Sequence, residues 1–98
     1  MPVAVKIKFD TAANRRFIIH DGAFVPLNAS GEGTIQVEVN EFDLILFGIE
    51  GAPGTTGTIT LTPPANHRLE ISSHPIQIKV AQGKTRAGDN RFFRIRPV

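Results

Sequence analysis

Cysteine is absent from this 98-residue chain, and so are tryptophan and tyrosine. Without cysteine there is no disulfide, no zinc–thiolate site and no thiol nucleophile. Small secreted domains commonly need disulfides, so the absence favours a reducing compartment. Sugar and peptide sites favour aromatic residues with a polar edge, so seven phenylalanines without tryptophan or tyrosine disfavour a lectin-like site.

Long apolar runs are also missing. None approaches the roughly 18 residues that a membrane-spanning helix needs. Residues 1–9 alternate between apolar and polar from the start, instead of placing a basic region before an apolar run, so we expect no signal peptide. We therefore predict a cytoplasmic protein with no membrane partner. Its length suits one domain, and its 41% apolar content argues against disorder.

A helical pattern is the next absence. No stretch keeps a 3.6-residue apolar period over ten or more residues, whereas alternation with a period of two recurs along the chain. The alternating segments are spaced as in sandwiches and barrels. We predict that residues 1–98 form a single all-β domain, an antiparallel β-sandwich of about 7–8 strands with an immunoglobulin-like or related Greek-key topology. A small closed barrel is the second choice.

The segment 42–49 is the only one that is apolar on both of its alternating faces. A strand with one wet face alternates, while a strand buried on both sides does not. We predict that it is the central strand, with Leu46 and Phe47 buried on opposite faces. The cleanly alternating segment 58–62 is expected to pair back on it through the glycine-rich loop 51–57.

Two other segments allow a prediction of which side chains point inward. In 15–20, Phe17 and Ile19 are expected to face the core, and Ile18 is ambiguous. In 91–96, Phe93 and Ile95 are expected to face the core. Residues 81–90 between the last two strands are predicted to be a basic, glycine-rich loop.

The three histidines, His20, His67 and His74, are candidate metal ligands only if the fold gathers them, because a catalytic zinc needs three ligands and an open position. Neither H-x-H nor H-E-x-x-H occurs. His20 precedes Asp-Gly and His74 precedes proline, so both are expected in turns at the surface. We predict no metal site and no cofactor.

Catalytic patterns are equally sparse. Glu38, Glu41, Asp43 and Glu50 surround the predicted central strand, and two carboxylates held about 5–10 Å apart can hydrolyse a glycosidic bond. Solubility at strand ends explains the same positions. No serine lies in G-x-S-x-G, and the G-K-T at residues 83–85 lacks the earlier glycine and the following helix of a nucleotide-binding loop. We predict that the protein is not an enzyme, with a small carboxylate-dependent hydrolase as a distant alternative.

Charge is segregated along the chain. Residues 1–16 carry a net charge of +3, residues 17–66 contain no lysine or arginine and carry −6, and residues 67–98 carry +5. Arginine suits phosphate and carboxylate groups, and an outward aromatic side chain can stack a base or anchor a partner. The candidate binding residues of this basic third are Lys79, Lys84, Arg86, Arg91, Phe92, Arg94 and Arg96. By alternation, Phe92, Arg94 and Arg96 point outward.

The same cations have a plainer explanation, because edge strands carry outward charge that prevents aggregation and can pair with the acidic middle third. Segregated charge can also steer a partner or align copies of the chain. The sequence therefore predicts a non-enzymatic β-sandwich that contacts another protein or itself. The alternative is an anion or nucleic-acid binder that uses the basic C-terminal face.

Overall fold

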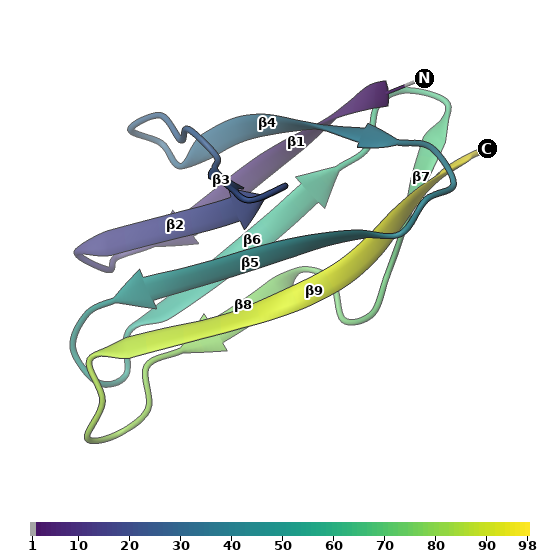
Figure 1. Cartoon of the computed structure of the whole chain (residues 1–98). Coiled ribbons are helices and arrows are strands. Elements are labelled where there is room, and N and C mark those ends of the chain that lie inside the picture. Colours follow the sequence, from purple (N-terminus) through teal and green to yellow (C-terminus); the bar gives the residue numbers. More distant parts are fainter. Residues whose placement is uncertain (1) are drawn as a thin grey trace.

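The computed structural model describes residues 2–98 as two antiparallel sheets packed face to face, with no closed barrel in this range (Figure 1). In spatial order, the four-stranded sheet consists of β4 (Glu32–Glu38), β1 (Pro2–Thr11), β6 (Thr56–Thr62) and β8 (Ile76–Lys79). The five-stranded sheet consists of β3 (Ala23–Phe24), β2 (Arg15–His20), β5 (Asp43–Glu50), β9 (Arg86–Pro97) and β7 (His67–Ile71). The predicted sandwich and its single compact domain are confirmed.

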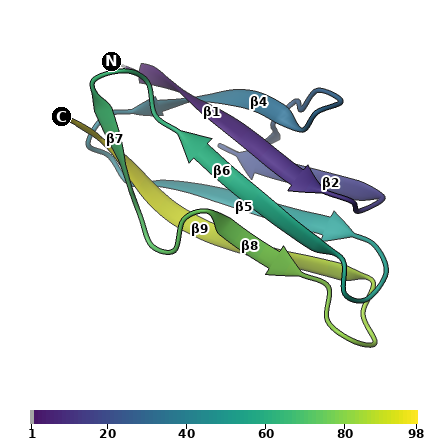
Figure 2. The same ribbon diagram turned by 180° about the vertical axis from the view of Figure 1, so that it is seen from behind.

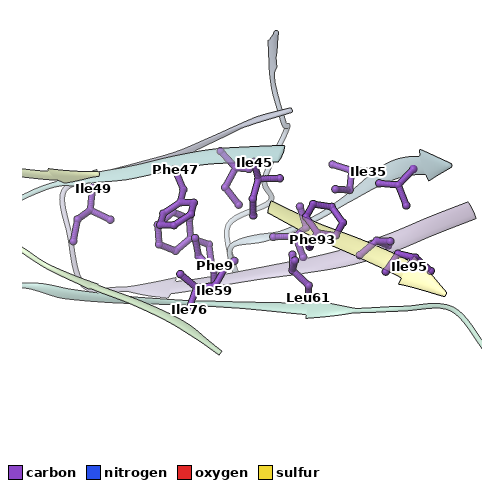
Figure 3. Packing of buried hydrophobic residues seen from close by; sticks show 14 of the residues in the cluster. Phe9, Ile35, Ile45, Phe47, Ile49, Ile59, Leu61, Ile76, Phe93 and Ile95 are labelled. Carbon is purple, nitrogen blue, oxygen red and sulfur yellow. The ribbon is translucent and has the colours of Figure 1, made fainter. Parts of the chain in front are cut away.

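Alternation in the sequence becomes a dry core and two outer faces. Along β1, Val5, Ile7 and Phe9 are buried while Lys6 and Lys8 are exposed. Branched and aromatic side chains fill the space between the sheets from both sides (Figure 3). The buried cluster contains Val5, Ile7, Phe9, Ile18, Ile35, Val37, Ile45, Phe47, Ile49, Ile59, Leu61, Ile76, Val80, Phe93 and Ile95. The predicted inward positions of Phe93 and Ile95 are confirmed.

The predicted central strand corresponds to β5, which lies between β2 and β9. The prediction that both faces of this strand are buried is wrong, because Phe47 is 1% exposed while Leu46 is 42% exposed. A two-layer sandwich buries one face of each sheet, and the other face meets solvent. Phe42 lies before the first residue of β5 and is also exposed.

The predicted hairpin between β5 and β6 is also wrong. β6 pairs with β1 and β8 in the opposite sheet, so the chain after Glu50 crosses from one layer to the other (Figure 2). Two backbone hydrogen bonds hold the crossing, from Gly51 N to Thr85 O at 2.9 Å and from Gly54 N to Val80 O at 2.8 Å. The crossing lets the buried side of β6 face β5 across the core. Strands that follow each other in the sequence usually pair. A strand with alternating apolar side chains can also bury its apolar side after the chain has crossed to the other sheet.

The predicted orientation of β2 is reversed in the structure. Ile18 is fully buried and His20 is 8% exposed, whereas Phe17 points outward and is 40% exposed. Ile19, the other residue expected inward, lies on the outer side with Phe17 by alternation. The turn after His20 has positive φ at Asp21 (51°) and Gly22 (76°), as the Asp-Gly pair predicts.

The C-terminal strand is longer than expected. β9 begins at Arg86, so half of the predicted loop 81–90 belongs to the strand. Phe92 points outward as predicted and is 61% exposed. No helix in residues 2–98 is long and apolar enough to cross a membrane.

Candidate functional site

Exposed apolar side chains gather on one surface of the molecule. Across residues 2–98, the large apolar side chains that remain exposed are Phe17, Phe24, Phe42, Leu46, Phe92 and Val98. All except Val98 lie on the outer side of the five-stranded sheet, or just beyond the start of β5 in the case of Phe42. With the half-buried Ile19 and Leu44 between them, they form what we call the apolar face: Phe17, Ile19, Phe24, Phe42, Leu44, Leu46 and Phe92.

Strand register makes the apolar face continuous. Phe24 pairs with Ile19, and Ile19 pairs with Leu46, so one row of apolar side chains crosses β3, β2 and β5. In the next row, Leu44 pairs with Phe92 on β9. Side chains directly opposite each other on neighbouring strands have Cβ atoms about 4.5–5.5 Å apart. The face is therefore one patch across four strands.

Phe17 lies over Gly48, a position of the apolar face that has no side chain. Its ring stands edge-on to Phe24 with centroids 6.1 Å apart. A Cβ atom added at Gly48 would lie 2.5 Å from the Phe17 ring, so only glycine allows the ring to lie there. Gly48 pairs with Gly88, and neither has a side chain. A hollow of about 460 Å³, which we call the glycine hollow, lies beside Phe17 with Gly88 and Ala87 in its lining.

Arginines surround a single carboxylate at each end of the face. Near Phe42, Glu70 accepts a hydrogen bond from Arg94 Nε at 2.9 Å and lies 3.6 Å from Arg68 and from Arg96. The guanidinium of Arg94 also stacks 4.3 Å from the centre of the Phe42 ring. The hydrogen bond from Arg94 and the charges of the three arginines lower the pKa of Glu70, although desolvation opposes them.

The second cluster lies at the other end of β5. Arg86 Nε donates to Glu50 at 3.2 Å, and Arg15 Nε lies 4.0 Å from the same carboxylate. Both arginines and Glu50 line the rim of the glycine hollow. The apolar face is thus bounded at both ends by mainly cationic side chains.

The structure distributes the predicted basic residues over several places. Arg86, Phe92, Arg94 and Arg96 are on the outer side of β9, whereas Lys79 is on β8 in the other sheet. Lys84 is in the loop before β9, and Arg91 donates from Nη1 to Ser72 O at 2.9 Å. Of the seven, only Phe92 belongs to the apolar face. A binding role for the other six stays a prediction.

The predicted acidic residues are also divided between two places. Asp43 and Glu50 occupy opposite ends of β5, and the seven steps of extended strand from one to the other span about 23 Å. That exceeds the spacing of a carboxylate pair in a glycosidase. Glu38, Glu41 and Asp43 instead line a second hollow together with Asp21.

His20 is the histidine whose expected surface position is wrong. Its Nε2 lies 2.9 Å from Asp43 Oδ1, and its Nδ1 lies 3.6 Å from Asp21 Oδ2. The possible metal-ligand atoms of His20, Asp21 and Asp43 lie within 4.8 Å of one another. Within residues 2–98, these three side chains are the group close enough together to hold a metal ion. Asp43 Oδ1 also accepts a bond from Leu44 N at 2.9 Å, so the oxygen nearest His20 is already in use. We interpret His20 as a buried polar side chain whose hydrogen-bonding need is met by Asp43.

His67 and His74 are also used within the fold. His67 Nδ1 lies 2.9 Å from Ala65 O, and His74 Nε2 accepts a hydrogen bond from Leu61 N at 2.9 Å. Neither residue belongs with His20 to the group within residues 2–98 that is close enough together to hold a metal ion. The three-histidine site considered from the sequence does not form.

No family model, curated protein or solved structure matches the chain. Its functional interpretation therefore depends on its own geometry. Sequence reasoning missed the apolar face because it assigned Phe17, Ile19 and Leu46 to the core. The available signal was an excess of apolar residues on both sides of segments 15–20 and 42–49, more than one buried face requires.

Proposed function

We propose that this domain is a non-enzymatic contact module that binds a protein through its apolar face. The observation that carries the proposal is the gathering of Phe17, Phe24, Phe42, Leu46 and Phe92 on one side of one sheet. Scattered exposed apolar residues are ordinary, but a contiguous patch with a polar rim is typical of an interaction surface. Aromatic anchors surrounded by arginine are common in such interfaces.

The opposite face of the molecule supports the proposal by contrast. On the outer side of the four-stranded sheet, register places Lys6 between Thr34 and Thr62, and Lys8 between Glu32 and Thr60. The same fold therefore presents a polar surface where no partner is needed. An immunoglobulin-like relationship stays a prediction, supported by the two-sheet architecture alone.

Anion or nucleic-acid binding has less support. Glu70 and Glu50 already neutralise part of the charge of the nearby arginines. Leu44, Leu46 and Ile19 occupy the centre of the face, and aliphatic side chains do not provide the flat aromatic surface on which bases stack. A protein surface with its own apolar side chains is the better match.

A photo-crosslinking residue at position 46 tests the proposal, with the same residue at Thr34 on the four-stranded sheet as control. We expect position 46, and not position 34, to crosslink a protein in the native cell. That protein, once purified, should bind wild type and lose at least about 30-fold in affinity against Leu46→Asp, as expected for a central contact. Thr34→Asp should bind as wild type. Equal or absent crosslinking at the two positions would contradict the proposal.

A further inference from the structure

We propose that the glycine hollow and its two arginines bind an acidic peptide segment of the partner protein, one in which an apolar side chain stands beside a carboxylate. The inference rests on the proposed contact function and names the chemistry that one end of the apolar face recognises. Three observations support it: an uncovered glycine in β9, the spare hydrogen-bond donors of Arg15 and Arg86, and the size and concave shape of the site.

Gly88 is the uncovered glycine. Its neighbour Gly48 is already explained by the fold, because the Phe17 ring lies where a side chain at Gly48 would be. Apart from its chain neighbours, the atoms within 4 Å of a Cβ added at Gly88 are Phe47 O at 3.2 Å and Gly48 Cα at 3.9 Å, both in the backbone. Glycine inside a strand often marks a place where another molecule approaches closely. We therefore assign the space above Gly88 to an apolar side chain of the partner.

The size of the site suits a short segment. The exposed apolar side chains of the face leave on the order of 500 Å² in water, less than the about 800 Å² that each partner buries in a stable complex of folded proteins. The hollow itself measures about 460 Å³, within the range of sites that hold small ligands. A lipid surface is flat and would leave the hollow unfilled, so the concave shape favours a peptide side chain over a membrane.

Arg15 and Arg86 have hydrogen-bond donors to spare. Their side chains are 83% and 80% exposed, and both approach the single carboxylate of Glu50. In the hydrogen bonds of residues 2–98, Arg86 uses only its Nε and Arg15 uses none. Asp89, in the same part of β9, pairs with Phe47 and points to the opposite side of the sheet. One positive charge is thus unbalanced, and guanidinium groups have the geometry to bind a second carboxylate.

The arginine at the other end of the face is already engaged. Arg94 donates to Glu70, its guanidinium stacks on the Phe42 ring, and its side chain is only 25% exposed. A carboxylate of the partner would have to compete with Glu70 for this group. We therefore place the partner's carboxylate at Arg15 and Arg86, and assign apolar contacts to the rest of the face.

Selection of displayed peptides tests the inference without knowledge of the partner. A random-peptide phage library is selected on the full chain, after removal of phages that bind Gly88→Val, in which the new side chain occupies the hollow. We expect the recovered peptides to carry an aromatic or large aliphatic residue adjacent to an aspartate or a glutamate. Far-UV circular dichroism and melting temperature check that Gly88→Val is folded.

Calorimetric titration of one recovered peptide tests the charge contact separately. Changing its acidic residue to the amide should weaken binding at least about 10-fold, as expected for loss of a hydrogen bond between charged groups. Arg15→Gln with Arg86→Gln in the protein should do the same, and both changes together should cost little more than either, because they remove one contact. Lys6→Gln with Lys8→Gln, on the four-stranded sheet, is the matched control and should bind as wild type.

Several results would overturn the inference. They are a selection that yields no peptide, recovered peptides without acidic residues, and a peptide that binds the double arginine variant as tightly as wild type. Binding of phosphatidylserine vesicles through Arg15 and Arg86, without binding of any peptide, would replace the peptide by a lipid surface. If position 46 crosslinks a protein that binds the double arginine variant as tightly as wild type, the contact function stands and this inference alone is wrong.

Discussion

The two sheets of this sandwich have similar inner faces and opposite outer faces. Inside, both contribute branched and aromatic side chains to one core. Outside, the four-stranded sheet carries lysine, threonine and glutamate, while the five-stranded sheet carries Phe17, Leu46 and Phe92. Folding accounts for the inner faces and for the polar outer face. Folding does not account for the apolar outer face, and for that reason we propose a contact role for this surface.

The inner faces differ in one respect. Across residues 2–98, His20 is the buried polar or charged side chain, and it belongs to the five-stranded sheet. It comes from β2, where Asp43 on the neighbouring strand β5 supplies its hydrogen-bond partner. The sheet with the apolar outer face therefore also contains the one polar pair that reaches the core.

The largest change in unfolding free energy is expected when substitutions on the two faces of β5 are compared. Phe47→Ala should cost about 3–5 kcal/mol of unfolding free energy, because it leaves a cavity in the core. Leu46→Ala should cost about 1 kcal/mol or less, because its side chain is already 42% exposed. Denaturant unfolding measures both. A cost at Leu46 equal to that at Phe47 would make the outer face a structural surface and remove the contrast.

The second-largest change in unfolding free energy is expected at the polar pair of His20 and Asp43. Asp43→Ala should lower the unfolding free energy by about 1–3 kcal/mol, because it leaves the buried His20 ring without its partner. The double variant His20→Leu with Asp43→Ala should recover part of this loss, since both polar groups are then gone. A double variant no more stable than Asp43→Ala would mean that the two side chains are not coupled.

The smallest effect concerns acid stability at the rim of the apolar face. The pKa of Glu70 lies below its ordinary value of 4.5, mainly through the hydrogen bond from Arg94 and against desolvation. A lowered folded-state pKa contributes stability that is present above pH 4.5 and is lost as the pH falls through the folded value. Glu70→Gln should therefore flatten the fall in melting temperature below that pH.

The matched control for Glu70 comes from the other outer face. Glu32→Gln also removes a strand carboxylate, one that lies 4.0 Å from the Lys8 ammonium group. Melting temperatures of wild type and both variants between pH 3 and pH 7 make the comparison. A Glu70→Gln profile that falls as steeply as wild type would show that the arginine cluster does not stabilise the fold through this carboxylate.

The sequence predicted the sandwich because a period of two is read directly from side chains such as Val5, Ile7 and Phe9. It also predicted that Phe92 points outward. It failed at β2 because apolar residues occupy both sides of that strand. Only the position of Asp43, 23 residues further on, makes the inward orientation of His20 favourable.

The apolar face could not be predicted from local pattern for a related reason. A strand that is buried on both sides and a strand that exposes one apolar side have the same sequence pattern. Which of the two forms depends on how many layers pack around the sheet. The pairing of β6 is likewise a choice between hairpin and arch that depends on β1. Both outcomes are tertiary properties.

The crossing from β5 to β6 also affects how the chain folds. β1 pairs with β4 and β6, and β5 pairs with β2 and β9, so most ladders join segments that are far apart in sequence. Each such ladder requires closure of a long loop before its contacts form, which slows folding toward the millisecond-to-second range. On the ribosome, β5 is synthesised before β9, so one edge of β5 stays unpaired until β9 emerges. The strand that carries the proposed contact surface is thus also a part of the nascent chain that is prone to aggregation.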